Sequence, residues 1–171
     1  LNTVVKPGHS AAVLRIKGTR KHLALTADCN GLMCWLDPRT GAQMAVAEAA
    51  RNLVCAGARP LAVTNCLNFG NPMKPEIFYQ FKEAVEGMGQ ACSFLETPIT
   101  GGNVSFYNEN QGDAVWPSPV IGMVGLVERP EHITTCGFKR QGDVVVLVGG
   151  PAQHLGGSQL YAQLHNKWIG P

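Results

Sequence analysis

Two segments of the chain carry hydrophobic residues at the three- to four-residue spacing of an α-helix. The first begins at Thr40, where Gln43 completes a capping box, and ends near Gly57. The second begins at Pro75, a favourable first-turn residue, and reaches about Leu95. Its apolar positions are Phe78, Phe81, Val85, Met88 and Cys92. The spacing therefore predicts two helices, each with one face against a core.

Short runs of apolar and β-branched residues predict strands before, between and after these helices. Residues 11–17 and 22–28 are expected to form an antiparallel pair joined by a turn of about four residues. Further strands are expected at 61–64, 99–100, 120–127 and 143–148. This order favours a layered α/β (α+β) fold over a helical bundle or a β-sandwich.

The length and composition fit one ordinary domain with a stub of another. The chain has 171 residues, of which 45% are hydrophobic and 15% charged, so it can bury a core without disulfides or metals. Its composition changes near Gly149–Pro151. We therefore expect one domain over residues 1–148, and over 149–171 a linker with the truncated start of a following domain. The opening Leu1-Asn2-Thr3 resembles an internal cut point, so we expect the chain to be part of a longer one.

Charge and hydropathy exclude several classes of function. The net charge is +2 and the basic residues are scattered, which argues against nucleic-acid binding. The longest apolar run, Val120–Val127, is far too short to span a bilayer, so no membrane association is expected. The six cysteines form no C-x-x-C pair and the five histidines are too dispersed for a zinc cluster. We expect a reduced, cytoplasmic protein.

Two segments rich in glycine and asparagine follow predicted strands, Asn65–Pro72 and Gly101–Glu109. We expect both to be loops at strand ends, where α/β sheets bind ligands. Gly102 permits close approach of backbone to a ligand, Asn103 offers an oxygen suited to Mg²⁺, and the Ser105 hydroxyl suits a phosphate oxygen. The alternative is that these are tight turns whose side chains satisfy local backbone groups.

Four carboxylates are further candidates for metal contact. They are Asp28, Asp37, Glu48 and Glu109. The alternative for each is a surface or helix-capping group, the commoner fate of such residues. General motifs for phosphate binding, dinucleotide binding, zinc proteases and serine hydrolases do not occur.

Several long, uninterrupted segments of the sequence resemble those of a known family. They are Ala45–Cys55, Cys66–Pro72, Gly102–Glu109 and Gly122–Leu126. Over residues 8–160 the chain resembles the second half of the synthetase subunit of phosphoribosylformylglycinamidine synthase, the formylglycinamide ribonucleotide amidotransferase of purine biosynthesis. The resemblance implies an ATP-utilising domain like the N-terminal domain of aminoimidazole ribonucleotide synthetase, with helices on one face of a layered sheet.

The resemblance also implies a reaction and roles for four residues. The family converts formylglycinamide ribonucleotide, ATP and glutamine-derived ammonia to the amidine, ADP and phosphate, with Mg²⁺ as cofactor. Gly102 matches an ATP contact, Asn103 a Mg²⁺ ligand and Ser105 a contact to the ribonucleotide. Asn65 stands where the family usually has an aspartate that contacts ATP, so here the negative charge is missing. No catalytic residue is assigned, because the family's general-base histidine belongs to the other half.

Partners follow from the same resemblance. The expected ones are the ribonucleotide substrate, the remaining domains of a longer chain and a glutaminase subunit that supplies ammonia. In the leading hypothesis this chain forms one wall of a shared ATP site and is inactive alone. In the alternative it is a structural half that dimerises through its sheet, so an isolated copy would form a homodimer. A third interpretation keeps the fold but assigns it to selenophosphate, thiamine phosphate or hydrogenase-maturation chemistry.

Overall fold

The computed structural model describes residues 2–6, 8–151 and 153–170. It divides into two compact units, Leu1–Thr135 and Cys136–Pro171. This division falls ahead of the expected domain boundary at 148/149, which stays a prediction. Each unit is described by itself below.

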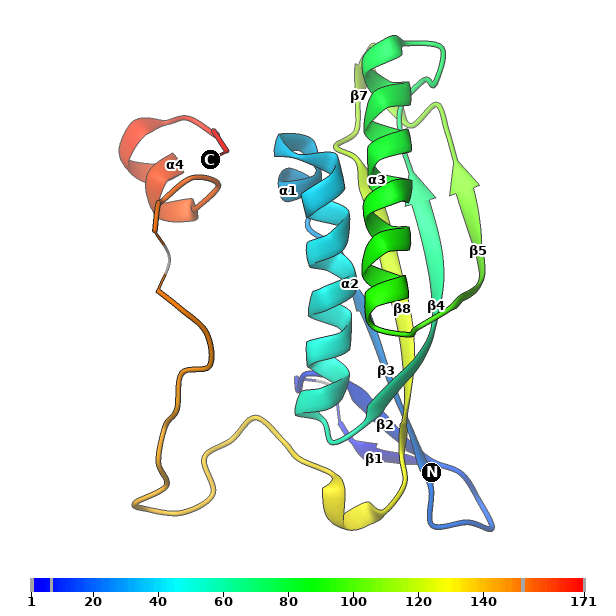
Figure 1. Ribbon diagram of the computed structural model, residues 1–171, viewed down its shortest axis with the longest axis vertical. Helices are drawn as coiled ribbons and strands as arrows, with labels where there is room; N and C mark the ends of the chain where they lie inside the picture. The colour runs from blue at the N-terminus through cyan, green and yellow to red at the C-terminus, as the bar shows by residue number, and fades with distance from the viewer. Residues whose placement is uncertain (1, 7, 152, 171) are drawn as a thin grey trace. The chain divides into compact units, whose positions relative to one another are not determined.

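Within the described residues, the first unit is built on a six-stranded sheet of order β1-β2-β3-β8-β4-β5 (Figure 1). The strands are β1 (Thr3–Val5), β2 (Ala12–Arg15), β3 (His22–Asp28), β8 (Ser118–Val127), β4 (Arg59–Asn68) and β5 (Ile99–Ser105). β4 and β5 are parallel, and the other neighbours are antiparallel. The expected pair at 11–17 and 22–28 is confirmed as β2 and β3. A separate ladder joins β6 (Glu109–Asn110) to β7 (Asp113–Ala114).

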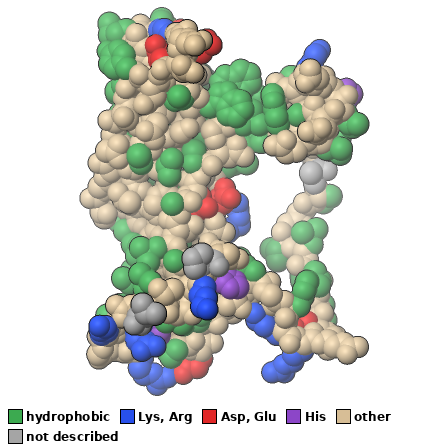
Figure 2. Space-filling model, turned by 180° about the vertical axis from the view of Figure 1, so that it is seen from behind, with side chains coloured by type: hydrophobic (Ala, Val, Ile, Leu, Met, Phe, Trp, Pro, Cys, Tyr) green, Lys and Arg blue, Asp and Glu red, His purple; other side chains and the backbone are tan. Residues whose placement is uncertain are grey.

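Three helices of the first unit lie on one face of this sheet, α1 (Gly31–Leu36), α2 (Pro38–Cys55) and α3 (Pro75–Phe94) (Figure 1). The parallel pairing of β4 and β5 follows from α3, since parallel neighbours need a crossover connection and α3 provides it. No helix formed by the described residues of this unit covers the opposite face, and Figure 2 shows hydrophobic side chains spread over it. The predicted layered α/β (α+β) fold is confirmed.

The N-cap of helix α2 lies three residues earlier than predicted, at Asp37 in place of Thr40. Asp37 is its N-cap, with a carboxylate oxygen that accepts from the Thr40 backbone N–H at 2.9 Å, and Pro38 occupies the first turn. A carboxylate at the N-cap explains the difference, because it satisfies a free N–H and complements the helix dipole. Gln43 does not close a capping box; it donates to Gln90 on α3 at 2.9 Å.

The core lies between the helices and the sheet, and small residues let the helices approach closely. The largest buried side chains include Phe69, Leu53 and Ile121. At Gly87 of α3, a Cβ atom would lie 2.2 Å from the Arg39 carbonyl oxygen of α2, so only glycine fits. The Arg39 guanidinium also donates to Glu83 at 2.6 Å. Together these contacts fix α3, which forms one side of the groove described below.

Two further sequence expectations are wrong. Residues 143–148 form no strand; the five apolar side chains Val144–Val148 are between 72% and 93% exposed. High β-propensity alone does not make a strand, because its backbone needs a partner to pair with. Conversely, Asn65–Asn68 and Gly101–Ser105 are not loops but the final residues of β4 and β5. Parallel pairing with each other holds these amides and glycines extended despite their low propensity.

The second unit contains a short helix, α4 (Gln159–His165). Ser158 caps it by accepting from the Tyr161 backbone N–H at 3.0 Å, and Asn166 ends it in the left-handed conformation. Across the described part of the chain, no helix has the length and apolar character needed to cross a bilayer.

Candidate functional site on the β4–β5 edge

The parallel ladder between β4 and β5 aligns the predicted site residues in pairs. Asn65 lies opposite Gly102, and Asn68 lies opposite Ser105. Asn103 pairs with Cys66 between them. Gly102 and Asn103 are exposed, while Asn65 and Ser105 are half-buried. The ladder thus brings all four predicted residues to one end of two adjacent strands, with β5 as the edge strand of the sheet.

Gly102 and Asn65 are in direct contact. A Cβ atom at Gly102 would lie 1.9 Å from the Asn65 Oδ1 atom and 2.5 Å from the Asn65 carbonyl oxygen. The other end of the Asn65 amide donates weakly to Met88 Sδ on α3, at 3.6 Å. Because Gly102 has no Cβ atom, the Asn65 side chain of the adjacent strand β4 can occupy the space beside it. The Asn65 side chain lies on the helix-covered side of the sheet.

An open groove of about 650 Å³ runs between α3 and the β4–β5 pair. Its apolar side is formed by Phe81, Val85 and Met88 of α3. Its polar groups come from the strands, with Asn65 on β4 and Asn103 on β5. The groove therefore joins an apolar wall to the Asn65 amide and to the backbone around Gly102 and Asn103, a combination suited to a small ligand with a flat ring and a polar end.

Ser105 lies beyond this groove, at the point where β5 leads into a tight turn. Its carbonyl oxygen accepts from the Phe69 backbone N–H at 3.0 Å and from the Asn108 side-chain amide at 2.8 Å. Asn108 also donates to the Phe69 carbonyl at 3.1 Å. Because β5 is extended through Ser105, strand alternation places Asn103 and Ser105 on the same face of the sheet, opposite to that of Gly102. The two hydrogen bonds to its carbonyl oxygen thus hold the Ser105 backbone in place.

Sequence reasoning did not single out Lys74 and Asn108, which hold the two segments together. The Glu109 carboxylate accepts from the Asn71 backbone N–H at 3.1 Å and from Lys74 Nζ at 2.9 Å. The Lys74 ammonium and the Asn71 N–H lower the pKa of Glu109. In the sequence, Asn108 and Glu109 are indicated only by their position shortly after Ser105.

Three of the four candidate metal-binding carboxylates have structural partners. Asp28 accepts from Thr26 at 2.6 Å and from Asn52 at 2.8 Å. Asp37 caps α2 and Glu109 binds Lys74, as described above. Across the described residues, no three His, Cys, Asp or Glu side chains gather in a way that would hold a metal ion. A Mg²⁺ ion at Asn103 would therefore take most of its oxygen ligands from water and from a bound phosphate.

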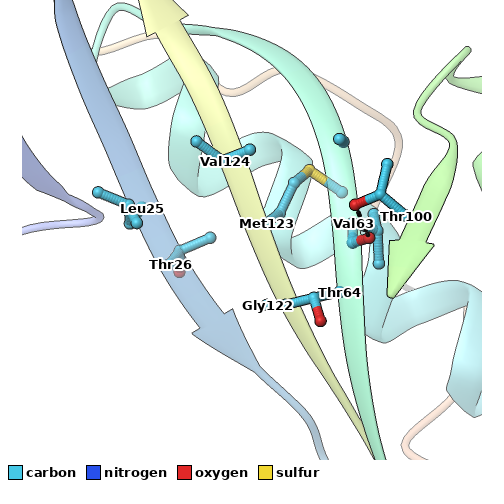
Figure 3. Close-up of a pocket in the computed structure, with 9 residues that line it drawn as sticks. Leu25, Thr26, Val63, Thr64, Thr100, Gly122, Met123 and Val124 are labelled. Carbon is cyan, nitrogen blue, oxygen red and sulfur yellow. Dashed lines mark hydrogen bonds between the residues drawn. The ribbon is translucent and has the colours of Figure 1, made fainter. Parts of the chain in front are cut away.

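A second, smaller cavity of about 160 Å³ lies on the uncovered face of the sheet (Figure 3). Its lining residues include Leu25, Thr26, Thr64, Thr100, Gly122 and Val124. The Thr100 hydroxyl donates to the Val63 carbonyl at 3.3 Å, drawn as a dashed line in Figure 3. This cavity has no charged side chain in its lining. Its apolar character fits packing against another surface better than binding of phosphate.

Three solved structures from Thermotoga maritima resemble this chain. Phosphoribosylformylglycinamidine synthase II matches with 35% identity and a TM-score of 0.72, over 80% of this chain and 22% of that one. PurL complexed with ATP matches with 34% identity and a TM-score of 0.73, over 80% and 23%. PurL complexed with FGAR matches with 35% identity and a TM-score of 0.72, over 79% and 22%.

The chain thus spans less than a quarter of the length of these three Thermotoga maritima proteins. The family model of the N-terminal domain of AIR synthase related proteins matches residues 8–127. This range covers the sheet from β2 to β8, its three helices and the β4–β5 groove. The chain belongs to the AIR synthase related family, through that N-terminal domain.

Proposed function

We propose that this chain is part of an ATP-dependent ligase of purine biosynthesis, a phosphoribosylformylglycinamidine synthase. In this proposal the β4–β5 edge forms one wall of a site for ATP, Mg²⁺ and formylglycinamide ribonucleotide. The observation that carries it is the paired arrangement of Asn65 with Gly102 and of Cys66 with Asn103, beside an open groove. Similarity to Thermotoga maritima proteins complexed with ATP and with FGAR supports the same ligands.

The edge position of β5 supports contact with ATP. An edge strand pairs on one side only, so its outward peptide groups are free to bind a ligand. At Gly102 the place of a Cβ atom is taken by Asn65, so contact with the nucleotide falls to the outward peptide groups of β5. Asn65 Oδ1 lies against Gly102, where it can accept from an N–H or ribose hydroxyl of a nucleotide in the groove.

Asn103 and Ser105 are proposed to bind the metal and the ribonucleotide. The Asn103 amide oxygen is a hard ligand, and phosphate and water would complete the Mg²⁺ shell. The Ser105 hydroxyl can donate to a phosphate or ribose oxygen of the substrate, from a backbone held by Asn108 and Phe69. Other domains of a longer protein would supply the second wall and the general base, and a glutaminase subunit the ammonia.

Calorimetric titration of the chain with ATP and Mg²⁺ tests the nucleotide wall. We expect binding that Asn103→Ala weakens about tenfold or more, as for the loss of one contact to a charged group. Asn110→Ala is the matched control, because Asn110 is exposed on β6 and does not line the groove. Absence of binding by the unmodified chain at millimolar ATP would contradict the proposal.

We also expect no synthetase turnover from this chain alone, because half of the proposed site would be missing. An assay of ADP release in the presence of formylglycinamide ribonucleotide and ammonia measures this. Turnover at a rate typical of a complete ligase would show that the site is not shared. A cytoplasmic location stays a prediction.

The uncovered sheet face favours a second role, dimerisation. Leu25 on β3 is 39% exposed on this face, and the half-buried Val124 lies opposite it on β8. The apolar cavity of Figure 3 lies on the same face as Leu25. We expect a homodimer in sedimentation experiments, which Leu25→Asp would shift to monomer. A monomer at high micromolar concentration of the unmodified chain would argue against this role.

A further inference from the structure

Two cysteines meet where β3 leads into α1. Asn30 is the N-cap of α1, and its side-chain oxygen accepts from the Met33 backbone N–H at 3.3 Å. Cys29 is therefore the residue before the cap, and Cys34 is the fourth residue of the helix. Side chains at these two positions pack against each other at helix N-termini. Here both are thiols, and a hydrogen bond from Cys34 is the main cause that lowers the pKa of Cys29.

The two thiols differ in access to solvent. Cys34 is completely buried, whereas Cys29 is partly exposed. A Cβ atom at Gly41 of α2 would lie 2.5 Å from the Cys34 backbone nitrogen, so α2 holds the Cys34 backbone tightly in place. A reagent from solvent therefore reaches Cys29 first, while Cys34 is shielded in the core.

The hydrogen bond also gives the two thiols different reactivities. The Cys34 thiol donates to Cys29 and lowers the pKa of the Cys29 thiol. The same bond, together with burial, raises the pKa of Cys34. Cys29 is thus the readier thiolate, and the thiolate is the form that attacks a disulfide.

We propose that Cys29 and Cys34 form a reversible redox site that exchanges with low-molecular-weight disulfides. The Cys29 thiolate attacks one sulfur of the small disulfide, forms a mixed disulfide and releases one small thiolate. Cys34 then attacks the Cys29 sulfur, the Cys29–Cys34 bond forms, and the second small thiol leaves with the Cys34 proton. The protein loses two electrons and two protons, and the small disulfide is reduced to two thiols.

The site is independent of the proposed nucleotide wall. Neither cysteine lines the groove between α3 and the β4–β5 pair. The disulfide would instead tie the end of β3 to α1. At Gly31 of α1, a Cβ atom would lie 3.3 Å from the Ser118 hydroxyl of β8, so α1 also packs against the start of β8. Oxidation would therefore restrain the junction of β3, α1 and β8.

Equilibration of the chain with mixtures of reduced and oxidised glutathione tests the proposal. Free thiols are then blocked with N-ethylmaleimide, and the disulfides are located by peptide mass spectrometry. We expect one intramolecular bond, Cys29–Cys34, that dithiothreitol reverses. Cys34→Ala should instead leave glutathione attached to Cys29, and Cys29→Ala should leave Cys34 reduced. Cys55→Ala is the control, since Cys55 is exposed and free in the structure and its loss should leave the bond unchanged.

The unmodified chain alone decides the outcome if a variant fails to fold. Absence of the Cys29–Cys34 bond in fully oxidised glutathione, in a chain that still melts cooperatively, would overturn the proposal. So would a bond between any other two cysteines in its place. Neither result depends on whether ATP binds, so failure here and failure of the proposed function are distinguishable.

Discussion

Strands β8 and β5 belong to one sheet but have opposite surroundings. β8 is paired on both sides, by β3 and β4, and half-buried and buried residues alternate along its ten positions. β5 is paired on one side only, and the first six of its seven residues are exposed. The central strand therefore stabilises the fold, while the residues of the edge strand are less constrained by packing and can be suited to ligand binding. The proposed site residues Gly102, Asn103 and Ser105 are all on β5.

The largest expected effect concerns stability and compares two valines. Val127 on β8 is fully buried, and Val104 on β5 is 50% exposed. Val127→Ala should reduce the free energy of unfolding by about 2–3 kcal/mol, because it removes buried apolar surface and leaves a cavity. Val104→Ala should cost less than half of that. Urea unfolding of both variants measures the difference, and equal losses would mean that β5 supports the fold as much as β8.

The contact between the two strands of the site is the next test. Gly102→Ala places a Cβ atom against Asn65 Oδ1 and should destabilise the fold by about 1–2 kcal/mol. Adding Asn65→Ala should recover part of this loss, because the side chain in the way is then gone. Gly89→Ala on α3, where nothing lies within 4 Å, is the matched control and should not destabilise. If the two changes at 65 and 102 add without coupling, the contact is not what fixes Gly102.

Charge at position 65 gives a smaller effect, seen in binding. Asn65→Asp restores the family's usual aspartate and should tighten binding of Mg²⁺–ATP by about 1 kcal/mol, as a charged acceptor replaces a neutral one. Calorimetry at low and high Mg²⁺ measures this. Asn68→Asp adds the same charge three residues further along β4 and should have less effect. Weaker binding by Asn65→Asp would mean that the amide NH₂ group is itself a contact to the nucleotide.

Local patterns were sufficient for the two long helices, α2 and α3, and for the layered fold, but not for the short helices α1 and α4. Pro75 itself marks where α3 begins, and Met88 and Cys92 of the predicted apolar face are buried. Phe78 and Val85 of that face are instead 54% and 37% exposed, and Ile77 and Ala84 are buried in addition. These local patterns did not predict which strands pair with one another. The runs Val120–Val127 and Val144–Val148 have similar compositions, yet the first lies in the central strand and the second is exposed. A strand depends on partners far away in the sequence, and single-residue propensities do not contain them.

The candidate site was predicted only in part, again because local patterns do not contain the pairing of strands. Gly102, Asn103 and Ser105 were found because unusual residues stand together in the chain. Their alignment with β4 depends on the parallel ladder, which no local pattern contains. Lys74 was missed because its role depends on Glu109, which is 35 residues away in sequence and 2.9 Å away in space.

The smallest expected effect is the pH dependence that Glu109 adds. Its pKa is lowered by Lys74 and by the Asn71 N–H, so the carboxylate stabilises the folded state above the ordinary pKa of a glutamate. That stabilisation is lost as the pH falls through the lowered pKa. Glu109→Gln should therefore unfold more readily than the unmodified chain near neutral pH, with a difference that narrows in acid. Thermal unfolding across acidic and neutral pH measures this, with Glu48→Gln, at an exposed acid, as control. A difference that persists unchanged into strong acid would mean that the side chain acts through packing, and that the two segments of the site are not held by this ion pair.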